Sequence, residues 1–182
     1  MPGSGKSVVG EKLANRLGWQ FLDTDVEIET LLGMKVSEIF EDRGEAGFRA
    51  EESRVLGRAA ASMQPCVVAV GGGAVLDPVS RKRLAESGSV VWLKASPEVL
   101  YSRLGDNAQN LRPLLKGDVL AVLERIEAFR RPMYTALSDL TVDVDSFSEG
   151  EAVEAILSQL APLGILSASE RNQPDSLWKS EN

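Results

Sequence analysis

A phosphate-binding pattern opens this chain and leads directly into a helix. The run Gly3-Ser4-Gly5-Lys6-Ser7 fits the second half of the pattern G-x-x-x-x-G-K-[ST]. Apolar residues then recur every four positions until Gly18, which predicts an amphipathic helix over residues 7–17. A glycine-rich turn joined to a helix in this way favours a fold that presents a helix N-terminus to an anion.

The residue types in this turn suit a nucleoside triphosphate. Six residues are expected to turn their backbone toward the phosphates: Gly3, Ser4, Gly5, Lys6, Ser7 and Val8. The Lys6 ammonium would reach the β and γ phosphates of ATP, and the Ser7 hydroxyl would ligate Mg²⁺. The alternative is an ordinary Gly/Ser turn with a solvated lysine, which the clear helix directly after it disfavours.

The pattern is incomplete at its N-terminal side. Its first glycine would fall one position before Met1, and no strand leads into the turn. Because that strand lies centrally in folds of this kind, its loss would leave ladder groups on two neighbouring strands unpaired. We therefore expect the native polypeptide to extend upstream by roughly ten residues, about one strand and the glycine. The intact mass of the natural protein tests this expectation.

Composition narrows the possible functions. The 182 residues suit one domain, and their net charge of −7 disfavours nucleic acids and anionic membranes as partners. The sequence contains no histidine, which excludes histidine triads, histidine-ligated metals and imidazole acid–base catalysis. Cys66 lies in an apolar run and is expected to be a buried structural thiol. Without a membrane-length apolar run, a signal pattern or a surplus apolar helix face, we expect a cytoplasmic monomer.

Short apolar strands alternate with helices along the chain. Strands are predicted at residues 19–22, 66–70, 90–93 and 140–144. Helices are predicted at 7–17, 26–32, 36–43, 45–61 and 118–138, and three more begin after the capping residues Asp77, Ser96 and Ser148. The alternation predicts an α/β fold with a parallel sheet covered by helices on both faces. Residues 1–162 form the predicted domain, and 163–182 a disordered tail.

Two carboxylates follow the predicted strand at 19–22. Asp23 and Asp25 stand two positions apart, so both point into the crevice at the carboxyl ends of the strands. One can hold Mg²⁺ through water while the other faces an acceptor hydroxyl. The alternative is helix capping, with Asp25 as the N-cap of the helix at 26–32.

A run of three glycines ends the strand at 66–70. Gly71, Gly72 and Gly73 expose their backbone N–H groups and carry no side chains, which lets a small polar molecule approach the main chain. The alternative is a flexible turn.

Arginines supply the remaining signal. Arg49, Arg112 and Arg130 stand out in an otherwise acidic chain. Because a guanidinium group can donate two hydrogen bonds to a carboxylate or phosphate, together they predict an anion site. Taken singly, each is more often a solvated surface charge.

In order and spacing, these segments resemble the shikimate kinase family over residues 2 to about 160. The resemblance rests on Gly-Ser-Gly-Lys-Ser, Leu-Asp-Thr-Asp, Gly-Glu-x-x-Phe-Arg-x-x-Glu, Gly-Gly-Gly-Ala, Arg-Pro-Leu-Leu and Arg-x-Pro-x-Tyr. It implies transfer of the ATP γ-phosphoryl group to the 3-hydroxyl of shikimate, toward chorismate and the aromatic amino acids. It also implies a P-loop, nucleoside-monophosphate-kinase-like sheet of five parallel strands, of which this chain lacks the first, central one.

The resemblance implies roles on the substrate side. Asp25 would bind the acceptor hydroxyls and could take the proton, while Arg49 and Arg130 would hold the shikimate carboxylate. Glu52 would hold Arg49 from one helical turn away, and the Gly72 backbone would meet the ring hydroxyls.

On the nucleotide side, the resemblance implies that Lys6, Ser7 and Asp23 hold the phosphates and Mg²⁺. Arg112 belongs to a lid at about residues 105–117 and would close onto the ATP phosphates. Arg103 corresponds to the arginine that stacks on adenine in this family. The loop at 146–150 lacks the basic residue that many relatives place near adenine, so no adenine contact is assigned there.

Two alternatives remain at the level of sequence. A gluconate kinase is the nearest enzymatic alternative, although its acyclic substrate suits Phe48, Arg49 and the glycine run less well. A non-catalytic nucleotide-binding protein is the second, because the phosphate-binding pattern is incomplete. ADP release with shikimate or with gluconate distinguishes the three functions.

Overall fold

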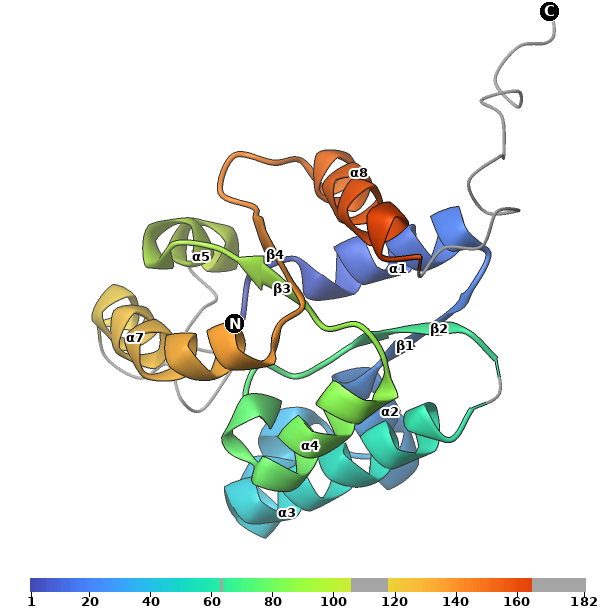
Figure 1. Ribbon diagram of the computed structural model, residues 1–182. Coiled ribbons are helices and arrows are strands. Elements are labelled where there is room, and N and C mark those ends of the chain that lie inside the picture. The colour runs from blue at the N-terminus through green and yellow to red at the C-terminus, as the bar shows by residue number, and fades with distance from the viewer. Residues whose placement is uncertain (63, 106–117, 165–182) are drawn as a thin grey trace, which may run out of the picture.

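The computed structural model describes residues 1–62, 64–105 and 118–164 (Figure 1). The strands are β1 (Gln20–Asp23), β2 (Cys66–Ala69), β3 (Val91–Lys94) and β4 (Leu140–Asp143). The helices are α1 (Lys6–Leu17), α2 (Thr24–Leu32), α3 (Val36–Ala60), α4 (Pro78–Ser87), α5 (Pro97–Leu104), α7 (Val119–Leu137) and α8 (Glu149–Leu160), with short 3₁₀ turns η1 (Ala74–Leu76) and η3 (Ala161–Leu163). The predicted lid and tail, apart from Gly105 and residues 163–164, lie outside the described residues.

The strands form two parallel pairs. β1 pairs with β2 from Gln20 opposite Cys66, and β3 pairs with β4 from Val91 opposite Leu140. The predicted α/β fold with parallel strands is confirmed. Within the described residues, however, no ladder joins β2 to β3, so the strands make two two-stranded sheets and not one continuous sheet.

Helices cover the strands from both sides. Figure 1 shows α1 and α8 on one side of the strand pairs and α2, α3 and α4 on the other, with α5 and α7 beside the ends of the strands. The contacts between elements agree with this arrangement. Helix α1 packs on α8 and β2, α2 packs on α3, and α5 packs on α7. Among the described helices, none combines the length and the apolar character that crossing a membrane requires.

The helix starts follow the capping residues in the sequence. The side chains of Asp77, Ser96 and Ser148 each accept a backbone N–H of the first turn, and Ser148 forms a capping box with Glu151. The two helices predicted at 36–43 and 45–61 follow one another within α3. The residue between them, Gly44, has a φ of 67°, which is not helical, so α3 is kinked there.

Buried side chains form two separate hydrophobic clusters. The larger one joins α1, α5, α7, β4 and α8, and includes Leu100, Leu123 and Ile156. The smaller one lies between α2 and α3 and consists of Ile28, Ile39, Phe48 and Val55. Each side of the molecule thus has its own core.

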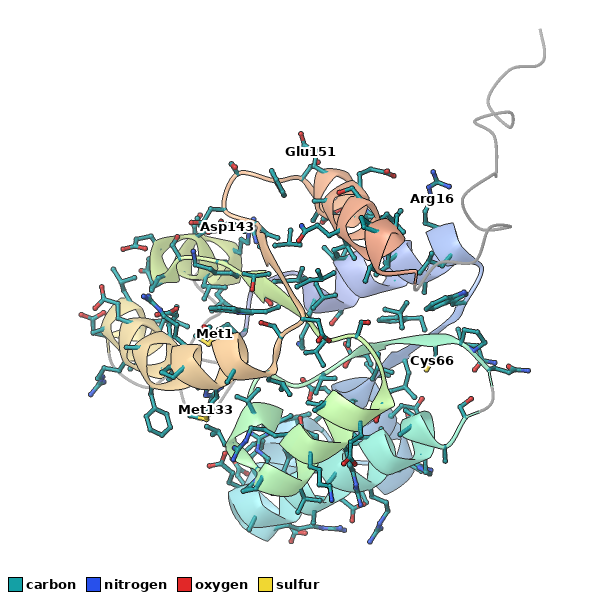
Figure 2. All side chains as sticks on the ribbon, in the orientation of Figure 1. Met1, Arg16, Cys66, Met133, Asp143 and Glu151 are labelled. Carbon is teal, nitrogen blue, oxygen red and sulfur yellow. The ribbon has the colours of Figure 1, made fainter. Side chains whose placement is uncertain are left out.

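One prediction about burial is wrong. Cys66 is only partly buried, although burial is enough to raise the pKa of its thiol. The same holds for most of β2 and all of β3, which the sequence reads as buried strands. The physical reason is a cavity of about 630 Å³ lined by both strands. Two of its lining residues, Met1 and Cys66, lie well apart across the molecule in Figure 2.

Candidate active site

The phosphate-binding turn has the backbone that its sequence predicts. Gly3 and Gly5 have positive φ values of 77° and 82°, and Gly5 is the N-cap of α1. No side chain caps this end, and the first turn contains no acidic residue. The free N–H groups and the helix dipole therefore face the turn, where an anion is stabilised. The Ser4 hydroxyl stiffens the turn by donating to the Met1 carbonyl at 3.0 Å.

Lys6 and Ser7 begin α1 beside this turn. Lys6 is the first residue of α1 and directly follows Gly5, so its side chain begins beside the backbone of the turn. The Ser7 hydroxyl donates to Asp23 Oδ2 at 2.5 Å, which places two oxygen ligands side by side. The described residues hold no group of three or more potential ligands among His, Cys, Asp and Glu. A hydroxyl and a carboxylate oxygen side by side fit Mg²⁺, which keeps several waters and phosphate oxygens among its ligands.

Asp23 and Asp25 have different environments. Asp23 is the N-cap of α2, since its Oδ1 accepts the Asp25 N–H at 3.0 Å. The predicted capping alternative is therefore wrong for Asp25, which lies in the first turn and has its carboxylate beside Gly71. A β-carbon on Gly71 would lie 3.0 Å from Asp25 Oδ1.

The glycine run is a fixed, buried turn. The Gly71 N–H donates to the Thr24 hydroxyl at 3.0 Å, and the Ala74 N–H donates to the Gly71 carbonyl at 3.0 Å. Side chains are excluded because a β-carbon on Gly71 would overlap Glu52 and one on Gly73 would overlap the Arg49 guanidinium. These contacts disfavour the flexible-turn alternative.

Arg49 approaches this turn from α3. Its Nη1 donates to Glu52 Oε2 at 2.7 Å and its Nη2 to Glu45 Oε1 at 3.2 Å. Glu52 is fully buried, whereas the Glu45 side chain is 47% exposed. The guanidinium carbon also lies 5.2 Å from the centre of the Phe48 ring. Arg49 is thus held by two carboxylates, the buried one of Glu52 and the partly exposed one of Glu45.

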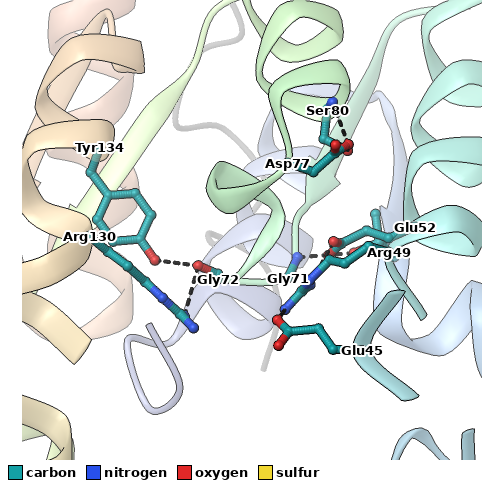
Figure 3. A network of polar contacts seen from close by, with 10 residues as sticks. Glu45, Arg49, Glu52, Gly71, Gly72, Asp77, Ser80, Arg130 and Tyr134 are labelled. Carbon is teal, nitrogen blue, oxygen red and sulfur yellow. Dashed lines mark hydrogen bonds and ion pairs between the residues drawn. The ribbon is translucent and has the colours of Figure 1, made fainter. Parts of the chain in front are cut away.

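Arg130 approaches the same turn from α7. Its Nη1 donates to the Gly72 carbonyl at 3.1 Å, and the Tyr134 hydroxyl donates to the same oxygen at 2.6 Å. Tyr134 also stacks on Trp92 of β3 with ring centroids 5.4 Å apart. Figure 3 shows Arg130 to the left of Gly71 and Gly72 and Arg49 to their right. Both guanidinium groups lie below the turn in this view. A small anion between them would meet two cations.

The comparison with known proteins decides which family this site belongs to. The model of the shikimate kinase family matches residues 2–161. The chain belongs to the shikimate kinase family. The shikimate kinase of Symbiobacterium thermophilum is 43% identical over 163 residues, which cover 89% of this chain and 93% of the relative.

Solved structures agree with this family. Shikimate kinase from Acinetobacter baumannii in complex with shikimate has a TM-score of 0.84 and 33% identity, and the match covers 89% of this chain and 90% of the other. A gluconokinase from Sinorhizobium meliloti has a TM-score of only 0.58 and 25% identity, covering 88% and 87%. The gluconate kinase alternative is therefore the less well supported one.

Three residues of this shikimate kinase site had no role assigned from sequence. Thr24 fixes the glycine turn, Tyr134 holds the Gly72 carbonyl, and Glu45 contacts Arg49. Thr24 and Tyr134 stand inside motifs that the sequence presents, Leu-Asp-Thr-Asp and Arg-x-Pro-x-Tyr, but their partners are distant in sequence. Only the folded chain shows which backbone atoms they meet.

The remaining predicted residues are placed only in part. Arg103, at the end of α5, donates to the Val144 carbonyl beyond β4 at 2.6 Å. This contact puts it beside the loop that follows β4. Arg112 lies outside the described residues.

Proposed function

We propose that this chain transfers the γ-phosphoryl group of ATP to the 3-hydroxyl of shikimate, in the space between the phosphate-binding turn and the glycine turn. The observation that carries the proposal is the convergence of Arg49 and Arg130 on Gly71–Gly73. The uncapped N-terminus of α1 after Gly5 supports it. Two guanidinium groups beside a glycine turn, with Asp25 next to Gly71, suit a substrate that has both a carboxylate and an acceptor hydroxyl. Family membership supports the same reaction.

On the substrate side, Arg49 and Arg130 bind the carboxylate of shikimate. Gly72 offers its backbone to the ring hydroxyls, because Arg130 and Tyr134 fix the orientation of its peptide group. The absence of side chains at Gly71 and Gly73 lets the ring approach the main chain. Asp25, beside Gly71, binds the acceptor hydroxyls.

On the nucleotide side, the backbone of residues 3–8 and the Lys6 ammonium bind the phosphates. Ser7 and Asp23 are the residues that would hold Mg²⁺, which supplies positive charge to the phosphate oxygens when bound. Arg103 binds on the adenine side, and Arg112 binds the ATP phosphates.

In the reaction, the 3-hydroxyl oxygen forms a bond to the γ-phosphorus while the bond to the ADP oxygen breaks. The hydroxyl proton passes to the Asp25 carboxylate. Because charge is spread over the γ-phosphoryl oxygens, Lys6 and the N–H groups of α1 contribute by stabilising that charge and by holding the two reactants in line.

An assay of ADP release with Mg²⁺ tests this function. We expect release with shikimate and none above background with gluconate. Asp25→Asn should lower kcat by about 10²- to 10⁴-fold, the usual contribution of a general base, and the exposed Asp42→Asn is the matched control. Release with neither acid would favour a non-catalytic nucleotide-binding protein, and release with gluconate alone would favour the other kinase.

We also propose that the protein acts as a monomer in the cytoplasm, as expected for a chain with one cysteine and a net charge of −7. Sedimentation velocity with and without both substrates tests the monomeric state. A concentration-dependent dimer would overturn it.

A further inference from the structure

Thr24 is fully buried at the junction of β1 and α2, and the reaction proposed above gives it no role. It is the first residue of α2 and stands between Asp23, the last residue of β1, and Asp25. A buried hydroxyl group is costly unless it is hydrogen-bonded. The Thr24 hydroxyl accepts the Gly71 N–H at 3.0 Å, although the two residues are 47 positions apart. It therefore links the start of α2 to the glycine turn.

The place of this hydrogen bond follows from the end of the parallel ladder. β1 and β2 are paired as far as Asp23 opposite Ala69. Beyond that point β1 becomes α2 and β2 becomes the glycine turn, so backbone pairing between the two strands stops. Gly71 is buried, and its N–H needs another acceptor, which the Thr24 side chain supplies. The hydroxyl thus holds the two segments together where both leave the sheet.

Three consecutive residues connect this junction to both sides of the site. Asp23 accepts the Ser7 hydroxyl at 2.5 Å and is therefore tied to the start of α1. Asp25 has Oδ1 beside Gly71, since a β-carbon on Gly71 would lie 3.0 Å from that oxygen. Thr24, between these two carboxylates, holds Gly71 itself. The Thr24 side chain thus sets where the glycine turn lies relative to Asp25.

We propose that Thr24 is a positioning residue, which holds the glycine turn against Asp25 so that the acceptor hydroxyl lies in line with the γ-phosphorus. This role rests on the proposed function, because it concerns the same reaction. The middle of the turn has separate anchors, since the Gly72 carbonyl accepts from Arg130 and Tyr134 (Figure 3). Loss of the Thr24 hydroxyl should therefore loosen the acceptor end of shikimate and leave its carboxylate bound. A misplacement of about 1 Å is enough to slow a reaction about 100-fold.

Thr24→Val tests this role, because valine has the shape of threonine but leaves the Gly71 N–H without its acceptor. We expect Thr24→Val to lower kcat about 10- to 100-fold and to leave the dissociation constant of shikimate, measured by calorimetry, nearly unchanged. Thr24→Ser keeps the hydroxyl and should retain kcat. Ser80→Ala is the matched control, because Ser80 is also fully buried in the first turn of a helix but bonds to Asp77, away from the glycine turn (Figure 3). It should lower stability without lowering kcat.

Amide hydrogen exchange measures the same anchor without kinase activity. In Thr24→Val the Gly71 amide should exchange about 10-fold faster, which corresponds to the net loss of one hydrogen bond. In Thr24→Ser it should exchange at the rate of the unsubstituted chain. The Val144 amide, which donates to the Lys94 carbonyl beyond the other strand pair, is the internal reference.

Two results would overturn the positioning role. Equal exchange of the Gly71 amide in all three proteins would show that Thr24 does not hold the turn. An unchanged kcat in Thr24→Val, or an equal loss in Ser80→Ala, would show that the hydrogen bond serves the fold alone. An unsubstituted chain that releases no ADP with shikimate would instead contradict the proposed function, and with it the reaction that Thr24 serves.

Discussion

At the scale of single residues, Arg49 and Arg130 reach the glycine turn with different partners. Arg49 neutralises the fully buried Glu52, whereas Arg130 donates to the neutral Gly72 carbonyl. Removing Arg49 leaves a buried carboxylate without its cation, which costs about 3–5 kcal/mol. Removing Arg130 leaves the Gly72 carbonyl still bonded to Tyr134.

We therefore predict that Arg49→Ala and Arg130→Ala both raise the KM for shikimate by about 10- to 100-fold, the loss of one charged hydrogen-bond donor. Only Arg49→Ala should also lower the thermal midpoint strongly. Steady-state kinetics with varied shikimate and thermal unfolding measure the two effects. Arg54→Ala is the control, since Arg54 is 70% exposed and, in the part of the chain that the structure describes, pairs only with Glu51. An unchanged KM in both variants would contradict the carboxylate site.

Glu45 already occupies one side of the Arg49 guanidinium, because its carboxylate accepts a hydrogen bond from Arg49 Nη2. The contact is 3.2 Å long and the Glu45 side chain is 47% exposed. A substrate carboxylate that approaches Arg49 from the same side has to replace this contact, so Glu45 acts as an internal competitor.

We predict that Glu45→Gln lowers the KM for shikimate about two- to fivefold with kcat unchanged, as expected from an exposed ion pair worth about 0.2–1 kcal/mol. Glu45→Asp keeps the charge but shortens the side chain. It should lower the KM for shikimate as well if the direct contact between Glu45 and Arg49 causes the competition. Glu51→Gln, on the same helix, controls for net charge. A raised KM in Glu45→Gln would mean that Glu45 positions Arg49.

Several residues of the site could be predicted from the sequence, but their hydrogen-bond partners could not. Spacing alone identifies Asp23 and Asp25 as a pair, but it does not show which of them caps α2. The structure assigns the cap to Asp23, because the helix begins one residue before Asp25. Tyr134 and Gly72 are 62 positions apart, so their hydrogen bond depends on packing of α7 against the strands and has no local signal.

At the scale of elements, caps define where helices start. Asp77 accepts the backbone N–H and the hydroxyl of Ser80, the latter at 2.7 Å, and Ser80 is fully buried at the base of α4. The Ser80 hydroxyl is the main cause that lowers the pKa of Asp77 below its usual value. The folded protein therefore favours the charged form of Asp77.

We predict that Asp77→Ala lowers stability by about 1 kcal/mol at pH 7. Because the folded pKa is below the unfolded value, this contribution is complete above about pH 4 and is lost as pH falls through the folded pKa. Asp77→Asn keeps a capping oxygen but cannot titrate, so it should retain much of the stability and lose the pH dependence. Thermal unfolding of the three proteins between neutral and acidic pH measures both effects.

Elements with strong local signals were predicted closely. The four strands lie within one residue of their predicted starts, and the helices after Asp77, Ser96 and Ser148 begin where the caps place them. The conformation of the glycine run at residues 71–73 was not predicted, because a run of glycines has no preference for one conformation. Its shape comes from contacts with Thr24, Tyr134 and Arg49.

At the scale of the whole molecule, the two hydrophobic clusters support different parts of the site. The cluster of Ile28, Ile39, Phe48 and Val55 lies under α3, which carries Arg49 and Glu52. The larger cluster includes Ile156 of α8, which packs on α1 behind the phosphate-binding turn. Loosening one cluster should therefore affect one substrate more than the other.

The same substitution in each cluster tests this division. Ile39→Val and Ile156→Val each remove one methylene from a buried side chain and should cost about 0.5–1.5 kcal/mol of stability. Part of that loss of stability affects the nearby substrate site. Ile39→Val should therefore raise the KM for shikimate about two- to threefold and leave the KM for ATP unchanged. Ile156→Val should raise the KM for ATP by the same factor and leave the KM for shikimate unchanged. Kinetics with each substrate varied in turn, at a temperature where both variants are folded, measure the effects. Equal changes in both constants would show that the clusters act as one core, because strain would then pass freely between the two halves of the molecule.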